Sequence, residues 1–158
     1  MHCLLSLDLA IIIQSMEHNS QGIHSDKSEI DNITSVFFDI FTNTNHKQPD
    51  WFIINKVCIP ETIIIKKNGA AEIVYNLDSF VEPRRKILSD GTLTDFQESE
   101  IREETNIIGN IAQRFSKFQK SGYFNGEYFK AYGNKLFQFI KTTNGWKINS
   151  LIWEDEKT

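Results

Sequence analysis

Apolar residues follow a helical spacing in the first third of the chain and alternate with polar residues in the last third. The helical stripe consists of Ile30, Ile33, Phe37 and Phe41. Steps of three and four residues place these side chains on one face, which predicts a helix from Ser28 to about Thr42. Ser28 and Asp31 fit a capping box, in which two side chains accept hydrogen bonds from the free N–H groups of the first turn. We therefore expect the folded domain to begin at Ser28.

The middle of the chain contains shorter apolar runs. They predict a helix over residues 51–57, strands over 61–66 and 72–75, and a helix over about 78–88. Pro60 limits the first of these helices, because proline has no backbone N–H to donate. Asp78 or Ser79 is the expected cap of the second.

From Thr92 onward the alternation predicts a sheet. Strands are expected near residues 94–105, 108–120, 129–142 and 145–154, with bends at glycines between them. Three helical segments followed by four long strands indicate an α+β domain. We expect a cone-shaped domain in which three helices pack in the concave face of a curved antiparallel sheet, around one internal pocket.

Side-chain alternation along the strands defines two faces of this sheet. The apolar set, expected to face the helices, consists of Phe137, Phe139, Trp146, Ile148, Ile152, Ile111 and Phe115. The opposite set is mixed and includes Arg114, Ser116, Asn134, Gln138, Asn149, Leu151 and Trp153. A mixed face is typical of a subunit interface, and we expect a homodimer through it. A bulge would reverse the faces on any one strand.

Composition limits the size and the partners of the protein. The 158 residues, 40% of them hydrophobic, suffice for one packed domain. The net charge is −4 and no stripe of Lys and Arg is present, so no nucleic acid is expected as a partner. The basic triplet 84–86 is expected to be the solvated face of a helix. Cys3 and Cys58 form no metal or redox motif, so we expect an inert, buried Cys58 and no metal or cofactor.

The first sixteen residues are apolar, yet they contain no Lys or Arg and Asp8 interrupts them. A secretory signal needs a basic start and an unbroken apolar run. A membrane span needs about 20 apolar residues. We therefore expect residues 1–27 to form a poorly ordered extension, with no membrane partner and a cytoplasmic location. Export is the alternative if the apolar run acts as a signal.

Several short motifs occur in an order that resembles the nuclear transport factor 2-like superfamily. They are Phe80 with Pro83-Arg84 and Leu88, Gly91, Phe96-x-Glu98-x-Glu100, Gly109-Asn110-Ile111-Ala112, Gly133 with Phe137-Gln138-Phe139, and Gly145-Trp146-Lys147-Ile148 leading to Trp153-Glu154-Asp155-Glu156. The likeness covers residues 28–156 and is greatest to the small bacterial SnoaL-like proteins. It implies a cystatin-like cone, a pocket between sheet and helices, and frequent dimerisation. Because that superfamily includes isomerases, dehydratases, hydrolases and non-enzymatic transport factors, the resemblance does not decide between an enzyme and a binding protein.

The sharpest candidate chemistry lies on the first long strand, at Glu98, Glu100, Arg102 and Glu104. A two-residue spacing places these side chains on one face of a strand. If that face lines the hollow, one glutamate there would have a raised pKa and serve as general acid or base, with Arg102 holding an anion or the partner carboxylate. The alternative is a solvent or interface face with cross-strand ion pairs, because the opposite face of this strand is polar as well.

Two further sets are candidates for the site. His46 and Asp50 lie in the loop after the first helix, where they would relay a proton at the pocket mouth or simply be exposed. An aromatic set would line an apolar ligand pocket or fill the core outright. It consists of Phe37, Phe41, Trp51, Phe52, Phe80, Phe96, Phe115 and Phe137.

The expected function is binding of a small apolar or mildly polar molecule, with simple acid–base catalysis of the isomerase, cyclase or dehydratase type if the protein is an enzyme. The alternative is a non-catalytic dimeric binding or interaction module. The direction of Glu98, Glu100 and Arg102 discriminates between the two. Inward side chains support acid–base chemistry, whereas outward side chains support the interaction module.

Overall fold

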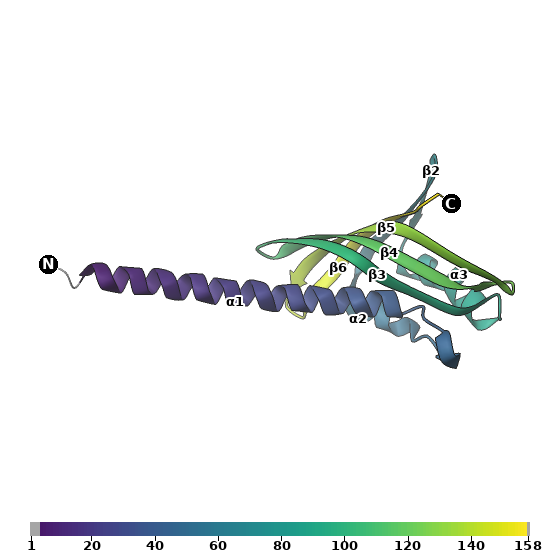
Figure 1. The fold of residues 1–158 in the computed structure, drawn as a ribbon, viewed down its shortest axis with the longest axis horizontal. Helices are drawn as coiled ribbons and strands as arrows, with labels where there is room; N and C mark the ends of the chain where they lie inside the picture. Colours follow the sequence, from purple (N-terminus) through teal and green to yellow (C-terminus); the bar gives the residue numbers. More distant parts are fainter. Residues whose placement is uncertain (1–3, 158) are drawn as a thin grey trace.

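The structure is a computed structural model that describes residues 4–157. A curved sheet arches over the helices, and the first helix extends far beyond it (Figure 1). The helices are α1 (Leu4–Asp39), α2 (Ile54–Val57) and α3 (Leu77–Ser89), with single 3-10 turns η1 (Thr44–His46) and η2 (Trp51–Ile53). The strands are β1 (Cys58–Asn68), β2 (Ala71–Tyr75), β3 (Leu93–Ile108), β4 (Ile111–Phe124), β5 (Glu127–Thr142) and β6 (Gly145–Asp155).

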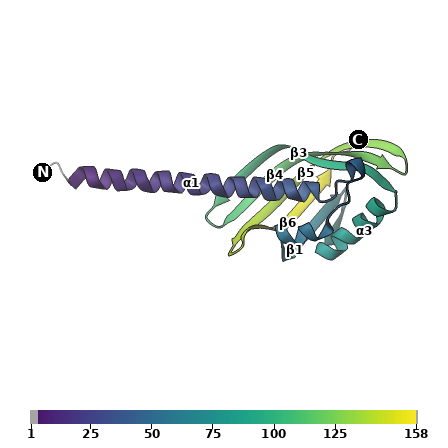
Figure 2. The ribbon, with the colours of Figure 1, turned by 90° about the horizontal axis from the view of Figure 1, so that it is seen from below.

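The sheet has the strand order β2-β1-β6-β5-β4-β3. β1 runs parallel to β6, and the other neighbouring pairs are antiparallel. Seen from below, α1 and α3 both lie under the concave side of the sheet (Figure 2). The predicted α+β class, the curved sheet and the helices in its hollow are confirmed.

The core lies between α1 and the centre of the sheet. Phe37 meets Phe137 edge to face at 5.5 Å between ring centroids, and Phe38 approaches the same ring at 6.0 Å. Trp146 of β6 belongs to the same core and is completely buried. Cys58 is buried as expected, and this burial raises the pKa of its thiol to about 12. Cys3 lies outside the described residues.

The predicted helix start at Ser28 is wrong, because α1 begins at Leu4 and runs through Ser28 without interruption. Asp31 does not cap a first turn. Its carboxylate instead accepts a hydrogen bond from Lys27, one turn earlier, at 2.6 Å. The polar stretch before Ser28, part of the extension expected to be poorly ordered, contains no proline, and its described side chains up to Ser25 are exposed on the helix surface. A polar sequence without proline therefore continues the helix, although it contains the weak helix former Gly22.

The cap of α3 lies earlier than expected. Asn76 caps the helix, because its side-chain oxygen accepts the N–H of Ser79 at 2.8 Å. The Ser79 hydroxyl oxygen accepts the N–H of Asn76 at 3.0 Å in return, which completes a capping box. This reciprocal pair fixes where α3 leaves β2 and so how its side chains enter the concave side.

The expected faces of β4 are reversed. Arg114 and Ser116 are buried, whereas Ile111 and Phe115 are exposed. The register gives the reason, since Arg114 lies opposite the buried Phe137 of β5, and directly opposed residues share a face. Apolarity alone assigned Phe115 to the core, but the pairing places it on the convex side.

The faces of β6 change partway along the strand. Phe139 pairs with Ile148, but Gln138 pairs with Ser150, so Asn149 is an extra residue in β6. This bulge turns Leu151 inward, although strict alternation from Ile148 points it outward. By the same shift Trp153 is buried and Ile152 is exposed, which corrects the expectation for all three side chains after the bulge.

Candidate functional site

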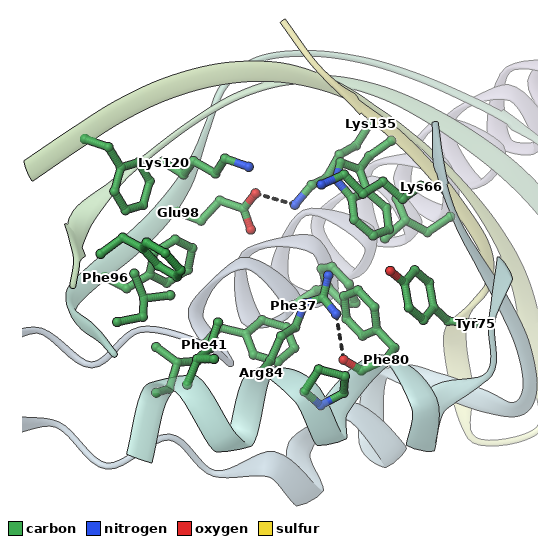
Figure 3. Close-up of a pocket in the computed structure, with 18 of the residues that line it drawn as sticks. Phe37, Phe41, Lys66, Tyr75, Phe80, Arg84, Phe96, Glu98, Lys120 and Lys135 are labelled. Carbon is green, nitrogen blue, oxygen red and sulfur yellow. Dashed lines mark hydrogen bonds and ion pairs between the residues drawn. The ribbon is translucent and has the colours of Figure 1, made fainter. Parts of the chain in front are cut away.

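A cavity of about 750 Å³ opens between the concave face of the sheet and α3. Side chains from α1, α3 and all six strands surround it (Figure 3). Its size suits an ordinary small organic ligand. The residues that line it are Phe37, Phe41, Lys66, Tyr75, Phe80, Pro83, Arg84, Ile87, Leu88, Leu93, Phe96, Glu98, Lys120, Phe124, Glu127, Tyr128, Phe129, Lys135, Leu151 and Trp153.

Aromatic rings form the deep wall of the cavity. Phe80 of α3 stands edge-on to Phe41, in the turn after α1, at 5.5 Å and lies nearly parallel to Phe37 at 6.3 Å. Phe96 of β3 stacks on Phe129 of β5 at 6.5 Å on the other side. These rings give the cavity a largely aromatic wall between the helices and the sheet.

One ion pair lies inside this apolar space. Lys135 Nζ lies 2.6 Å from Glu98 Oε1, and their side chains are only 6% and 10% exposed. The ammonium also lies 4.5 Å from the ring centroid of Phe38 and 4.4 Å from that of Phe118. Burial lowers the pKa of Lys135, and the charge of Glu98 opposes that shift. A carboxylate and an amine with a weakened hold on its proton are thus placed together in the cavity wall.

A second charged group stands beside this pair. Asp155 accepts a hydrogen bond from Lys120 at 2.6 Å and lies 3.4 Å from Lys66 Nζ. Burial raises the pKa of Asp155, but the two lysines outweigh it and hold the pKa below its usual value. Two ammonium groups at the cavity wall therefore share one carboxylate.

Arg84 enters the cavity from α3, contrary to the prediction that the basic triplet is solvated. Its guanidinium lies 3.8 Å from the ring centroid of Phe80 and donates a hydrogen bond to the Phe80 carbonyl at 2.7 Å. Tyr75 and Trp153 face the same group at 5.6 and 5.5 Å. Burial lowers the pKa of Arg84. The adjacent Arg85 is exposed, so helical phase separates the two arginines.

A bulge in β3 divides the glutamates and the arginine that the sequence placed on one face. The register shifts between Glu100 and Arg102, so Glu98 and Glu100 point inward whereas Arg102 and Glu104 are turned to the outer side. Glu98 alone of these four lines the cavity. The expected pairing of an inward Arg102 with the glutamates is therefore wrong.

Glu100 belongs to a charged cluster beneath α1. Arg114 reaches it with two hydrogen bonds, at 2.9 and 2.5 Å, and Ser116 donates a third. The same guanidinium lies 2.6 Å from Asp31 of α1 and 3.2 Å from Glu103. Burial would lower the pKa of Arg114, but its hydrogen bonds to Glu100 and Asp31 raise it instead. Glu100 thus joins the helix to the sheet rather than facing a ligand.

The other candidates are distributed over several places. Phe41, Phe80 and Phe96 line the cavity, Phe137 is buried in the core, and Trp51 packs on Phe41 at 6.0 Å. Phe52 is 73% exposed and Phe115, on the convex face, is 46% exposed. His46 is exposed in η1, and Asp50 is exposed and accepts the N–H of Phe52 at 3.1 Å as the cap of η2. The structure does not bring His46 and Asp50 to the cavity.

The sequence reasoning missed Lys135, Lys120, Lys66 and Arg84 as site residues. A signal for the lysines was present, since Lys135 has the same parity as Phe137 and Phe139 on its strand. A charged residue in an apolar row needs a buried partner, which points to a functional or structural pair. Among residues 4–157, no group of three His, Cys, Asp or Glu side chains is arranged to hold a metal ion.

In the part of the chain that the structure describes, residues 4–157, no helix is long and apolar enough to cross a membrane. No protein-family model matches the chain, and no curated protein matches it. Solved structures do match. A nuclear transport factor 2-like superfamily protein from Salmonella enterica serovar Typhimurium is 14% identical with a TM-score of 0.70, over 86% of this chain and 94% of that one.

Two further structures agree with the first. A protein from Novosphingobium aromaticivorans, described as nuclear transport factor 2-like with a cystatin-like fold, is 11% identical with a TM-score of 0.68, over 87% of this chain and 86% of that one. A putative Ca/calmodulin-dependent kinase II association domain from Exiguobacterium sibiricum is 6% identical with a TM-score of 0.65, over 84% and 94%. At these identities the likeness concerns the fold, and the chain has the nuclear transport factor 2-like, cystatin-like fold.

Proposed function

We propose that this chain is a SnoaL-like domain that binds a small apolar or mildly polar molecule in the cavity under its sheet. The observation that carries the proposal is the open cavity of about 750 Å³, because it is left unfilled although aromatic side chains surround it. Its wall combines flat rings with a few polar groups, which is the usual make-up of a ligand site. The buried pair of Glu98 and Lys135 is one of those polar groups.

Filling the cavity tests this proposal. Ile87 of α3 lines the cavity, so Ile87→Trp should occupy it without removing a charged group. We expect calorimetric titration with the neutral aromatic amide 2-naphthamide to detect binding to the wild type and at least about tenfold weaker binding to the variant, equivalent to about 1.4 kcal/mol. The control is Ile73→Trp on β2, where the side chain is exposed and outside the cavity. If neither 2-naphthamide nor the corresponding carboxylate bound to the wild type, the proposal would be wrong.

Glu98 is the residue that best supports acid–base catalysis in this cavity. Of the six candidates for this chemistry from the sequence it alone lines the cavity, and it lies 2.6 Å from the amine of Lys135. Such a pair can take a proton from carbon next to a carbonyl, with the carboxylate as the base. Proton abstraction is the first step of isomerase, cyclase and dehydratase chemistry of this kind.

Hydrogen–deuterium exchange measures this activity without knowledge of the natural substrate. The flat ketone 2-tetralone in D₂O should exchange its α-protons faster with wild-type protein than in buffer. Glu98→Gln should bring the rate back to that of buffer, and Glu104→Gln, on the outer side of the same strand, should not. A wild-type rate equal to that of buffer would remove the catalytic part of the proposal and leave the binding part.

A second candidate function is a non-catalytic dimeric module, and the convex face of the sheet favours it. Phe115, Leu136 and Ile152 lie opposite one another on β4, β5 and β6 and are all exposed. Ile111 and Ile140 form a second exposed apolar pair on the same face, separated from this row by the pair of Gln113 and Gln138. An exposed apolar surface of this kind is typical of an interface, here with a second copy of the chain. The similar structure from Exiguobacterium sibiricum is itself described as an association domain.

Light scattering coupled to size-exclusion chromatography tests the dimer. We expect twice the chain mass of 18.3 kDa for the wild type at micromolar concentration. Leu136→Glu, at the centre of the apolar row, should give the monomer mass because a buried, unpaired carboxylate disfavours association. Arg85→Glu on α3 also introduces a carboxylate but lies away from this face and should leave the dimer intact. A monomeric wild type would overturn the dimer.

A further inference from the structure

We propose that the ligand of this cavity carries a carboxylate, that Arg84 binds it, and that the apolar body of the ligand lies against the rings of Phe41, Phe80 and Phe96. This inference rests on the proposed binding function and names the chemical class of the ligand. It differs from the sequence-based expectation of an apolar or mildly polar molecule, because the charge of the cavity decides the class.

The guanidinium of Arg84 is the first reason. It is half-buried, it stacks 3.8 Å from the centroid of the Phe80 ring, and its hydrogen bond to the Phe80 carbonyl holds it in place. Tyr75 interacts with it and accepts a hydrogen bond, and Glu98 and Asp155 attract it from a distance, but no carboxylate in residues 4–157 forms an ion pair with it. An arginine has five N–H donors in a planar fork, so donors remain for a bidentate partner.

The balance of the neighbouring charges is the second reason. Lys135 is matched by Glu98, but Lys66 and Lys120 share the single carboxylate of Asp155. Glu127 also lines the cavity, so with Arg84 four cationic side chains face the three carboxylates of Glu98, Asp155 and Glu127. The chain as a whole has a net charge of −4, so this small positive excess runs against the composition of the protein. A local excess of one sign of charge raises the local concentration of ligands with the opposite sign.

The surroundings of Arg84 favour a carboxylate on an apolar body over a free inorganic anion. Phe41 and Phe80 flank the approach to the guanidinium, and Phe96 faces them across the cavity (Figure 3). Burial lowers the pKa of Arg84, which means that the cavity disfavours its charge while no ligand is bound. A bound carboxylate would offset that cost, and planar bidentate pairing with a carboxylate is the geometry that arginine favours.

Two probes of the same shape test the charge preference directly. The first is 2-naphthoate, which is ionised at pH 7, and the second is 2-naphthamide, which is neutral. We expect calorimetric titration of the wild-type chain to give a dissociation constant about tenfold lower for 2-naphthoate than for 2-naphthamide, equivalent to about 1.4 kcal/mol. Equal binding of the two probes would overturn the carboxylate proposal and leave the binding function standing. Binding of neither would overturn both.

Arg84→Met should remove the preference for 2-naphthoate over 2-naphthamide, because methionine keeps the apolar stem and loses the charge. The matched control is Arg85→Met, one position along the helix and exposed, which should keep the wild-type preference. Circular dichroism checks that both variants fold. A tenfold preference that survives in a folded Arg84→Met would overturn the assignment to Arg84, and the wild-type comparison of the two probes decides the ligand class even if that variant does not fold.

Discussion

Lys135 has an unusual environment for a lysine, because its side chain is almost completely buried. Its ammonium lies between the rings of Phe38 and Phe118, with Glu98 as its counter-ion. We expect Lys135→Met to lower the free energy of unfolding by about 3–5 kcal/mol, because it leaves the Glu98 carboxylate buried without a partner. Urea denaturation followed by tryptophan fluorescence measures this loss.

The double substitution tests whether Glu98 and Lys135 stabilise the protein as a pair. Glu98→Met combined with Lys135→Met should recover most of the loss, since an apolar pair of similar volume is usually neutral or stabilising in place of a buried ion pair. If the two single losses simply add in the double variant, the two groups do not act as a pair and the description of the site is wrong.

Gly133 is the second residue for which the structure predicts a clear effect of substitution on stability. A Cβ atom there would lie 2.5 Å from the backbone oxygen of Glu154 and 2.5 Å from the ring of Phe118. We expect Gly133→Ala to destabilise the fold by about 1–3 kcal/mol, because the sheet must move to admit one methyl group. Gly22→Ala in α1 meets no neighbouring atom and should raise the stability slightly. Thermal unfolding of both variants checks the contrast, and an unaffected Gly133→Ala would contradict the close packing of β5.

At the scale of the element, most of the fold could be predicted from the sequence because its signals are local. Alternation located β3 to β6, and apolar spacing located the C-terminal third of α1, which packs on the sheet. The faces were harder. One extra residue, Asn149 in β6, reverses every side chain after it, and nothing in the sequence marks that position as a bulge.

The same limit applied to the candidate site. The bulge after Glu100 separates Glu98 from Arg102, although their spacing on an ideal strand places them on one face. Arg84 was assigned to solvent because it stands in a basic triplet, yet α3 turns it inward while Arg85 faces out. Which face of a strand or helix meets a partner depends on packing between distant segments, and a single sequence does not contain that information locally.

The long element α1 gives a prediction of its own. The side chains of Ile11, Met16 and Ile23 are at least half exposed, at 59%, 67% and 50%. Among the described residues, α1 therefore buries no apolar side chain before Ile30. We expect removal of residues 1–21 to change the free energy of unfolding by less than about 0.5 kcal/mol, as for a surface change. Removal of residues 1–31 should unfold the domain, because Ile30 is completely buried. A large loss from the shorter deletion would contradict a domain that begins near residue 28.

For the molecule as a whole, three acidic side chains of α1 join the helix to the sheet. Asp26 accepts hydrogen bonds from Lys141 at 2.6 Å and from the Trp146 indole at 2.9 Å. Glu29 accepts the backbone N–H of Trp146 at 2.9 Å. Further along the helix, Asp31 reaches the buried Arg114. The attachment of α1 to the sheet therefore depends on carboxylates in their ionised form.

This dependence predicts how the stability changes with pH. Burial raises the pKa of Asp26 and of Asp31, but their hydrogen bonds to Lys141 and Lys27 outweigh it, so both pKa values lie below the ordinary one. Such groups bind fewer protons in the folded than in the unfolded chain, so their contribution is complete above the unfolded pKa of about 4 and is lost as the pH falls through the folded values. We expect the urea midpoint to be level from pH 7 to about pH 5 and to fall steeply below about pH 4.

Substitution assigns the acid transition to the joint between helix and sheet. Asp26→Asn should lower the stability at pH 7 and make the fall below about pH 4 shallower, because one of the titrating groups is gone. Glu61→Gln removes one carboxylate from an exposed position on β1 and should keep the wild-type profile. If Asp26→Asn kept the full slope, the acid transition would arise elsewhere, and α1 would be held to the sheet by apolar contacts such as that of Phe37 with Phe137 rather than by these carboxylates.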